Sequence, residues 1–326
     1  MAEIAVIVVN YNAGELALAA VESVLAHTHP GHDVHVHLVD NASPNGDGAM
    51  LAEAAETRGW GARVTLHLER VNHGFGRGNN LVLEELARRA APPDYVFLLN
   101  PDAQLEGETI ATLADFLAAH PKAAVAGARI RQPDSPKPVT AAFRFPSAVS
   151  TLSAAINFGP VARALARYEV ALPADIPTQR VDWVAGAAVL ARFDVWCELG
   201  FFDPEYFLYF EEVDLMLRTA RAGWECWHVA EAQVVHVEGA STEVRSLVPE
   251  RTRRPAYWYH SWQHYFRKNH GRGYALASAA AWTGGAAINH ALVRVRGGRA
   301  MAPKRFFGDF WAVGCRPLLG LPPGRV

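Results

Sequence analysis

Apolar runs and amphipathic segments alternate along the first hundred residues of the chain. Mostly apolar runs of strand length occupy residues 4–10, 35–40, 64–68 and 95–99. Such runs are typical of parallel strands that are covered on both faces. Between them, apolar residues recur at helical spacing over residues 15–27, 48–58 and 79–90. This repeated winding predicts an α/β fold with an open, mostly parallel sheet flanked by helices.

The pattern continues less regularly after residue 108. We expect a helix that ends near residue 120, strands at residues 123–128, 181–191 and 234–237, and a helix over residues 211–222. Gly223 is a good stop signal for that last helix. Residues 132–180 contain seven prolines. We therefore expect loops and short helices there, covering the cleft of the sheet.

Polar side chains fall at or just past the end of each early strand. These residues are Asn10, Asp40, Asn72 and Asp102. Ligands of open α/β sheets bind in the crevice at the carboxyl ends of the strands. Four strand ends that each supply a polar group predict a ligand site at this edge.

A glycine-rich stretch follows the third strand. Residues 72–80 read Asn-His-Gly-Phe-Gly-Arg-Gly-Asn-Asn and lead into a helix. Glycines let backbone amides approach a phosphate, and a helix N-terminus favours anions. The dinucleotide fingerprint has a different spacing and follows the first strand. The turn after the first strand, residues 11–14, lacks that fingerprint as well, so a NAD-binding protein is not expected.

Asp102 is the residue that we expect to contact a metal ion. A nucleoside diphosphate is a poor leaving group unless its growing charge is neutralised, which a divalent cation does. Mg²⁺ or Mn²⁺ suits an oxygen-rich site, and Asn100 can orient it without adding charge. Asp40 is suited to accept hydrogen bonds from a base or ribose. The sequence Asp40-Asn41-Ala42-Ser43 is also good turn chemistry, so both readings stay open.

A second acidic group begins the helix after residue 210. It contains Glu211, Glu212 and Asp214, and it follows an aromatic-rich loop. A carboxylate in a dry site is a suitable general base for a sugar hydroxyl. Two plainer readings remain, because acidic residues favour the first turn of a helix and Asp214 stands four residues before Arg218, at ion-pair spacing. Glu212 points away from Glu211 on the helix and is freer to face the cleft.

The formal net charge of −2 hides a strong asymmetry along the chain. From residue 244 to the end there are 14 Lys and Arg against 2 Asp and Glu, whereas the remainder has 17 against 31. A basic tail on an acidic body indicates an anionic partner, either lipid headgroups or nucleic acid, or else a solvated basic surface. Aromatic and basic residues interleave over residues 257–268. Residues 275–293 fit an interfacial helix or a helix packed on the main domain.

The remaining composition is that of an ordinary intracellular globular protein. The three cysteines, Cys197, Cys226 and Cys315, are far apart, which fits a reducing compartment. No secretion signal is read at the N-terminus. We expect a cytoplasmic protein with a main domain over residues 1–245 and a basic, aromatic-rich helical extension over residues 246–326.

Taken together, a series of segments in this chain resembles the inverting family 2 glycosyltransferases, especially the bacterial rhamnosyltransferase-like branch. The matching segments are residues 8–12, 40–43, 72–80, 100–102, 183–187, 200–203 and 211–215, together with His236. They occur in the order of the family and cover about residues 4–240. The resemblance implies a GT-A fold, a nucleotide-sugar donor and a divalent metal.

The resemblance also implies roles for individual residues. It assigns Glu212 as the base, with Glu211 and Asp214 beside it, and places Asp102 and His236 at the metal. It implies donor contacts from Asn10, Asn12, Asp40, Asn72, Gly74, Asn79, Asn100 and Asp102, and acceptor contacts from Trp183 and Gly186. The family usually has Asp at the second position of the Glu-Asp pair, where this chain has Glu212. Because Glu is one methylene longer, Glu211 remains an alternative base.

The implied function is metal-dependent, inverting sugar transfer to a hydroxyl of a glycan or polyprenyl-diphosphate-linked acceptor, in cell-surface polysaccharide synthesis. Rhamnose from dTDP-rhamnose is the first choice, and galactofuranose, N-acetylglucosamine and glucose stay open. The basic extension is then read as a peripheral contact with the inner face of the plasma membrane. A nucleotidyltransferase would need a basic loop after the first strand, and residues 10–14 contain no Lys or Arg. A nucleic-acid-binding protein would leave the acidic cleft unexplained, so no nucleic acid partner is expected.

Overall fold

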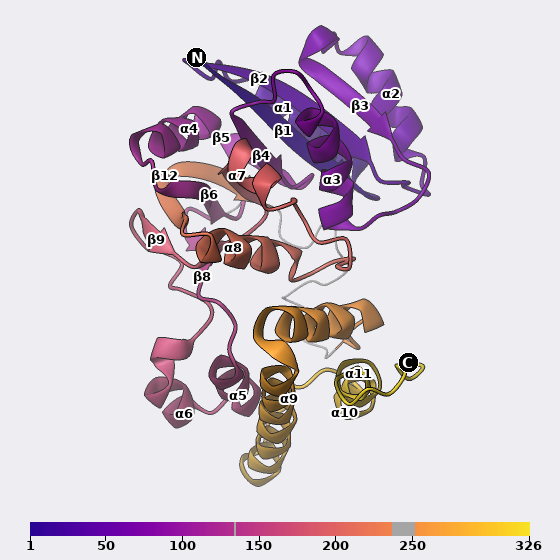
Figure 1. Ribbon diagram of the computed structural model, residues 1–326, viewed down its shortest axis with the longest axis vertical. Helices are drawn as coiled ribbons and strands as arrows, with labels where there is room; N and C mark the ends of the chain where they lie inside the picture. Colours follow the sequence, from indigo (N-terminus) through magenta and orange to yellow (C-terminus); the bar gives the residue numbers. More distant parts are fainter. Residues whose placement is uncertain (134, 237–251) are drawn as a thin grey trace. The chain divides into compact units, whose positions relative to one another are not determined.

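The computed structural model describes residues 1–133, 135–236 and 252–326 and divides the chain into two compact units (Figure 1). The first unit comprises Met1–Phe143, Leu172–Pro204 and Leu215–Ser246. The second comprises Arg144–Ala171, Glu205–Asp214 and Leu247–Val326. The chain passes from one unit to the other inside helix α8 (Glu211–Arg221), directly after Asp214.

The first unit is built on a mixed sheet that has ten strands in the described part of the chain. Its main path runs β3-β2-β1-β4-β11-β6-β12-β5. The parallel half contains β1 (Ala2–Asn10), β2 (His32–Asp40), β3 (Val64–Leu68) and β4 (Tyr95–Leu99). Next, β11 (Ala188–Arg192) runs antiparallel between β4 and β6 (Ala123–Arg131). Finally, β12 (Glu225–His236) is parallel to β6, and β5 (Ala103–Glu106) is antiparallel to β12.

Two short strands and a separate ribbon complete this unit. Strand β7 (Pro138–Val139) pairs with β6, and β9 (Gln179–Val181) pairs with β12. The ribbon joins β8 (Ala142–Phe143) to β10 (Trp183–Val184).

Helices cover both faces of the sheet because its central strands are apolar on both faces. On one face, α1 (Gly14–Leu25), α2 (Asp47–Thr57) and α4 (Thr109–Ala119) pack over a single continuous core. On the other lie α3 (Phe75–Ala87) and α7 (Phe193–Glu198). A Cβ placed on Gly78 in α3 would lie 3.0 Å from Cγ1 of Val9. Glycine therefore lets α3 approach the end of β1, where the polar strand ends gather.

The second unit is helical. It contains α5 (Ala148–Ile156), α6 (Gly159–Ala164), a 3₁₀ turn (Ala166–Tyr168), α9 (Ala256–Arg296), α10 (Phe306–Asp309), a π-helical turn (Phe310–Cys315) and α11 (Arg316–Leu318). Helix α9 bends at Gly271, whose φ of 82° is outside the helical range, and Figure 1 shows the two arms. Aromatic rings of its first arm, Tyr259, Trp262, Tyr265 and Phe266, are buried. Phe306 and Phe310 pack against Tyr259.

The structure confirms the predicted α/β class, the mostly parallel sheet with flanking helices, and the C-terminal helical extension. Strand β5 and helix α7 were not predicted. The strand predicted at residues 234–237 is wrong in its start, since β12 begins at Glu225, while Val237 lies outside the described residues. Residues 181–191 hold three short strand pieces rather than one strand. The division into domains at residue 245 stays a prediction.

The basic and aromatic extension also differs from its sequence reading. Most aromatic residues between 257 and 266 form core and are not a surface platform. In residues 275–293 one face is buried, with Gly285 against α5, which favours the packed-helix reading. Within the described ranges, no helix combines the length and hydrophobicity needed to cross a membrane.

Candidate active site

The carboxyl ends of β1 and β2 are joined by a buried polar cluster. Asn10 is fully buried, and its Nδ2 donates to Oδ1 of Asp40 at 2.9 Å and to Oδ2 of Asp47 at 3.0 Å. The Oδ2 of Asp40 accepts from the amide of Ser43 at 3.3 Å. Asp40 is itself only 4% exposed. Asn10 and Asp40 therefore come together as a preorganised acceptor group at the predicted edge.

Asp47 is a member of this cluster that the sequence analysis missed. It is the first residue of α2, and its Oδ2 accepts from the amide of Gly14 at 2.9 Å. Asn12 lies in the left-handed region, with φ of 56°, and its amide donates to Oγ of Ser43. The only sequence signal for Asp47 was an acidic residue at a helix start, which is common for reasons of the helix dipole.

The glycine-rich loop before α3 is fastened to the end of β2 by Asn41. Its Nδ2 donates to Oδ1 of Asn72 and to the carbonyl of Gly74, both at 3.1 Å. Gly74 has φ of 76°, which favours glycine at this turn. Asn79 donates to the carbonyl of Phe75 within its own helix and is almost fully buried. These contacts support the loop, and the donor-binding roles of Asn72, Gly74 and Asn79 stay predictions.

Asp102 and His236 meet although 134 residues separate them in the chain. The pairing of β5 with β12 places His236 opposite Ala103, the residue after Asp102. The Nε2 of His236 lies 3.0 Å from Oδ1 of Asp102. The side chain of Asp102 is 1% exposed and that of His236 is 14% exposed. The predicted pair of metal ligands is therefore assembled by strand pairing.

The donor set can be tested against a divalent cation. Across the described ranges, no group of three or more His, Cys, Asp or Glu side chains could hold a metal ion by itself. Mg²⁺ is commonly bound through one or two carboxylates, with the remaining positions taken by waters and substrate phosphates. One carboxylate and one imidazole nitrogen within hydrogen-bond distance fit such a site. These two ligands fit a cation that binds together with a diphosphate group, which supplies further oxygen ligands.

Trp183 begins β10, and Gly186 lies on the connection from β10 to β11. The ring of Trp183 stacks on Phe143 with centroids 4.1 Å apart and planes 15° apart. Close to Gly186, the carbonyl of Ala187 accepts from the amide of Asn100 at 2.9 Å. This bond fixes the residues around Gly186 beside the Asn100–Asp102 turn. Acceptor contact by Trp183 and Gly186 stays a prediction.

In the second unit, a strained turn delivers the acidic residues of α8. Tyr209 and Phe210 both have left-handed backbones, with φ of 69° and 70°. Such residues cost free energy and persist only where their surroundings hold them. The ring of Phe210 packs against Trp258 and Tyr265, and Ser261 donates to the carbonyl of Leu208 at 3.0 Å. The first arm of α9 therefore holds this turn in place.

Glu211 is buried and Glu212 is half-buried, and each has one carboxylate oxygen that lacks a partner. One carboxylate oxygen of each, Oε2, is inaccessible to water and has no hydrogen-bond partner. Burial raises the pKa of Glu211 well above its ordinary value, and the neighbouring charge of Glu212 raises it further. Burial also raises the pKa of Glu212. A neighbouring carboxylate pair with raised pKa values is suited to accept and hold a proton, and such groups cluster at functional sites.

Asp214 is buried to the same degree but is fully bonded. It accepts from Nζ of Lys268 at 2.8 Å, from Nδ2 of Asn269 at 2.7 Å and from the hydroxyl of Tyr206 at 3.2 Å. Arg218 donates to the backbone carbonyls of Leu199 and Phe201. The ion pair predicted between Asp214 and Arg218 stays a prediction. Asp214 anchors the start of α8, and a catalytic role for it stays a prediction.

Comparison with known families agrees with this architecture. The sequence profile described as "Glycosyltransferase like family 2" matches residues 2–257. An N-acetylglucosaminyl-diphospho-decaprenol L-rhamnosyltransferase of Mycobacterium tuberculosis is 33% identical over 220 residues, which are 64% of this chain and 68% of that protein. Rhamnosyltransferase WbbL of Escherichia coli is 25% identical over 166 residues, covering 50% of this chain and 61% of that protein.

Solved structures share the fold at low sequence identity. The mannosyltransferase PcManGT of Pyrobaculum calidifontis, in complex with GDP-Man and Mn²⁺, superposes with a TM-score of 0.55 at 17% identity. The match covers 97% of this chain and 82% of that one. This likeness confirms the GT-A type of fold that the sequence predicted.

Proposed function

This chain belongs to the glycosyltransferase like family 2, and from that premise we propose that it transfers L-rhamnose from dTDP-rhamnose to a hydroxyl of a lipid-linked glycan, inverting the anomeric centre. The class of reaction, sugar transfer from a nucleotide donor, follows from the family. The choice of sugar and acceptor is supported by the mycobacterial relative, whose name specifies rhamnose and a diphospho-decaprenol acceptor. The observation that carries the chemistry is the neighbouring pair Glu211 and Glu212, each with one buried carboxylate oxygen that has no hydrogen-bond partner.

Glu212 is the proposed general base. It takes the proton from the acceptor hydroxyl while that oxygen forms a bond to the anomeric carbon. The bond from this carbon to the diphosphate oxygen breaks, and the electron pair leaves with the nucleoside diphosphate. Its raised pKa makes Glu212 a stronger base than an exposed carboxylate. The raised value also lies closer to the working pH, where a general base is most effective. The titration of Glu211 is coupled to that of Glu212, so Glu211 influences how tightly the pair holds the accepted proton.

Residues of the first unit are proposed to bind the donor. Asp40, held by Asn10, accepts from the base or ribose, and Asn12, Asn72, Gly74, Asn79 and Asn100 line the same side. Asp102 and His236 hold Mg²⁺ or Mn²⁺. The cation supplies neutralisation of the charge on the departing diphosphate. Trp183 and Gly186 are proposed to contact the acceptor.

Replacing the base by its amide is the direct test. We expect Glu212→Gln to lower the transfer rate at least 10²-fold, because an amide cannot accept the proton. Donor binding, measured by calorimetry, should change little. Glu211→Gln serves as the matched comparison and should keep more activity while shifting the pH profile. Unchanged turnover in Glu212→Gln would remove this residue from the role, and a larger loss in Glu211→Gln would transfer the role to Glu211.

The metal assignment has its own test. We expect Asp102→Ala to weaken donor binding in the presence of Mn²⁺ at least tenfold and to abolish the difference between Mn²⁺ and chelator. Asp33→Ala, an exposed carboxylate of the same unit, is the control and should bind as the unsubstituted protein does. Normal metal dependence in the Asp102 variant would contradict the assignment.

A panel of nucleotide sugars tests which sugar the enzyme transfers. Diphosphate release and thermal stabilisation are compared for nucleotide-linked rhamnose, galactofuranose, N-acetylglucosamine and glucose, each with Mg²⁺ or Mn²⁺. Release only with a sugar other than rhamnose would replace the proposed donor while keeping the reaction. An acceptor of the proposed kind lies in a bilayer, so we place the enzyme at the cytoplasmic face of the plasma membrane.

A further inference from the structure

The last helical segment of the second unit, Phe306 to Leu318, is apolar on both of its faces. On the inner face, Phe306, Phe310 and Val313 are buried. On the outer face, Phe307 is 42% exposed and Trp311 is 51% exposed. These two residues are four apart along the helical segment, so they lie on one side of it. An ordinary surface helix has polar residues on its outer face, and this one does not.

The inner face of this segment packs against other side chains of the second unit, whereas the outer face is exposed. Phe306 and Phe310 pack against Trp282 with ring centroids 4.9 and 4.6 Å apart. Asp309 is buried and accepts two hydrogen bonds from Arg253, at 2.6 and 2.8 Å. The segment is therefore held mainly by its inner face. Phe307 also contacts the ring of His290, with centroids 5.5 Å apart, but much of its side chain stays exposed.

Further exposed apolar side chains flank this helical segment along the chain. Met301, five residues before α10, is 60% exposed. After α11 the chain turns back, and the amide of Gly324 donates to the carbonyl of Ala312 at 2.9 Å. This return brings the C-terminal segment, with exposed Leu319 and Leu321, to the same helical segment. Exposed apolar residues that gather in this way mark an interaction surface.

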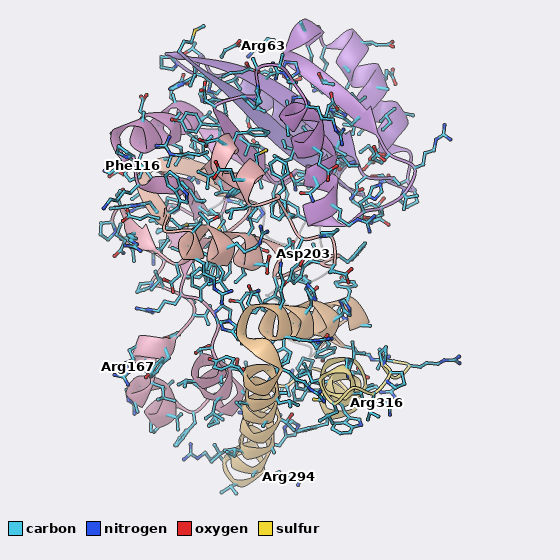
Figure 2. All side chains as sticks on the ribbon, viewed as in Figure 1. Arg63, Phe116, Arg167, Asp203, Arg294 and Arg316 are labelled. Atoms are coloured by element: carbon cyan, nitrogen blue, oxygen red, sulfur yellow. The ribbon has the colours of Figure 1, made fainter. Side chains whose placement is uncertain are left out.

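The charged residues near these exposed apolar side chains indicate what kind of partner binds there. Lys304 and Arg305 precede α10, and Arg316 follows the π-helical turn (Figure 2 labels Arg316). Over residues 252–326 the sequence has 12 Lys and Arg against a single acidic residue, Asp309. That carboxylate is buried, so the surface of this region is cationic. Trp and Phe beside Lys and Arg are the composition of a helix that lies in the headgroup layer of an anionic bilayer.

We propose that Phe307, Trp311 and Met301, with the nearby cations Lys304, Arg305 and Arg316, form a docking face for the surface of an anionic phospholipid bilayer. The aromatic side chains enter the headgroup layer, and the cations contact lipid phosphates. This goes beyond the transfer reaction and gives the second unit a function of its own. It also narrows the membrane contact, which the sequence reading placed on the whole extension of residues 246–326, to residues 301–316.

The test is flotation of the full chain with vesicles at 0.15 M salt. We expect binding to vesicles that contain 30% phosphatidylglycerol and much weaker binding to phosphatidylcholine alone. The double variant Phe307→Ser/Trp311→Ser should lower the partition coefficient by about tenfold or more. Lys304→Gln/Arg305→Gln should lower it by about fivefold per charge and reduce its salt dependence. The control Leu68→Ser/Val71→Ser, two exposed apolar residues of the first unit, should bind normally.

Two kinds of result would overturn the proposed docking face. Equal binding by Phe307→Ser/Trp311→Ser would exclude this face, provided that the thermal midpoint shows the variant folded. Binding to single-stranded RNA in place of vesicles, or a dimer in light scattering that the same variant dissociates, would assign the face to a different partner. Glu212→Gln should float as the unsubstituted protein does. A failure of docking is thereby distinguished from a failure of the proposed reaction.

Discussion

The helix start at α8 treats neighbouring carboxylates in opposite ways. Asp214 is fully buried and receives hydrogen bonds from Lys268, Asn269 and Tyr206. Glu211 is almost as buried, yet its Oε2 has no partner. Donors stabilise the charged form of a carboxylate, and burial without donors destabilises it. Asp214 is thus suited to hold a charge and anchor the turn, while the glutamates are suited to exchange a proton.

This contrast predicts a positioning role for Lys268. We expect Lys268→Met to lower the free energy of unfolding by about 1–3 kcal/mol, less than the full cost of breaking a buried pair because the ammonium is partly exposed. The loss of one donor should also loosen the start of α8 and shift the pH profile of transfer. Arg267→Met, an exposed neighbouring cation, is the control and should stay within about 0.5 kcal/mol. An unchanged pH profile with lowered stability would mean that Lys268 is only structural.

At the scale of elements, two adjacent glycines in α9 have different surroundings and different effects on stability. Gly285 faces α5, and a Cβ there would lie 2.7 Å from Cβ of Ala155 and 3.0 Å from the carbonyl oxygen of Leu152. Gly284 is exposed, and a Cβ there would meet nothing within 4 Å. Glycine at residue 285 therefore permits the close contact of α5 with α9, whereas glycine at residue 284 only costs helix stability.

The glycine pair provides its own control. We expect Gly285→Ala to lower the free energy of unfolding by about 1–3 kcal/mol, since α5 or α9 must shift to admit the methyl group. Gly284→Ala should raise it by about 0.5–1 kcal/mol, because alanine is the better helix former. Urea denaturation of the two variants measures both changes. Equal effects of the two substitutions would show that α5 does not constrain this part of α9.

The elements also show where sequence reasoning reaches its limit. The apolar runs of β1 and β4 predicted their strands because both faces of these strands are buried. Strand β12 was largely missed because Glu231 and other polar residues interrupt its apolar pattern. At the site, polar residues such as Asn10 and Asp40 were visible at strand ends. Asn41 and Asp47 were not singled out, because their importance comes from partners 31 and 37 residues away.

At the scale of the whole molecule, the two units carry opposite proton linkage. In the first unit, burial lowers the pKa of His37, and together with the neighbouring His35 and His67 it brings this pKa to about 3. Its Nδ1 lies 3.1 Å from Nε2 of His67. In the second unit, burial raises the pKa of Glu211. His37 therefore stabilises the fold when it is neutral above about pH 6.5, and Glu211 when it is neutral at low pH.

The signs follow from which state binds the proton more tightly. As pH falls from 6.5 toward 3, the unfolded chain protonates His37 before the folded one does, so stability is lost by up to about 1.4 kcal/mol per pH unit. For Glu211 the folded state holds the proton more tightly, and its contribution is lost as pH rises from 4.5 through the raised pKa. Between pH 5 and 7.5 the two effects oppose each other and partly cancel.

Single substitutions should therefore reveal opposite slopes. Relative to the unsubstituted protein, His37→Gln should make the chain comparatively more stable at pH 5 than at pH 7.5, because the acid-side loss disappears. Glu211→Gln should do the reverse. Denaturation in urea at both pH values measures the differences, and changes of the same sign in both variants would contradict the linkage. If the units unfold in separate transitions, His37→Gln should move only the transition of the first unit and Glu211→Gln only that of the second.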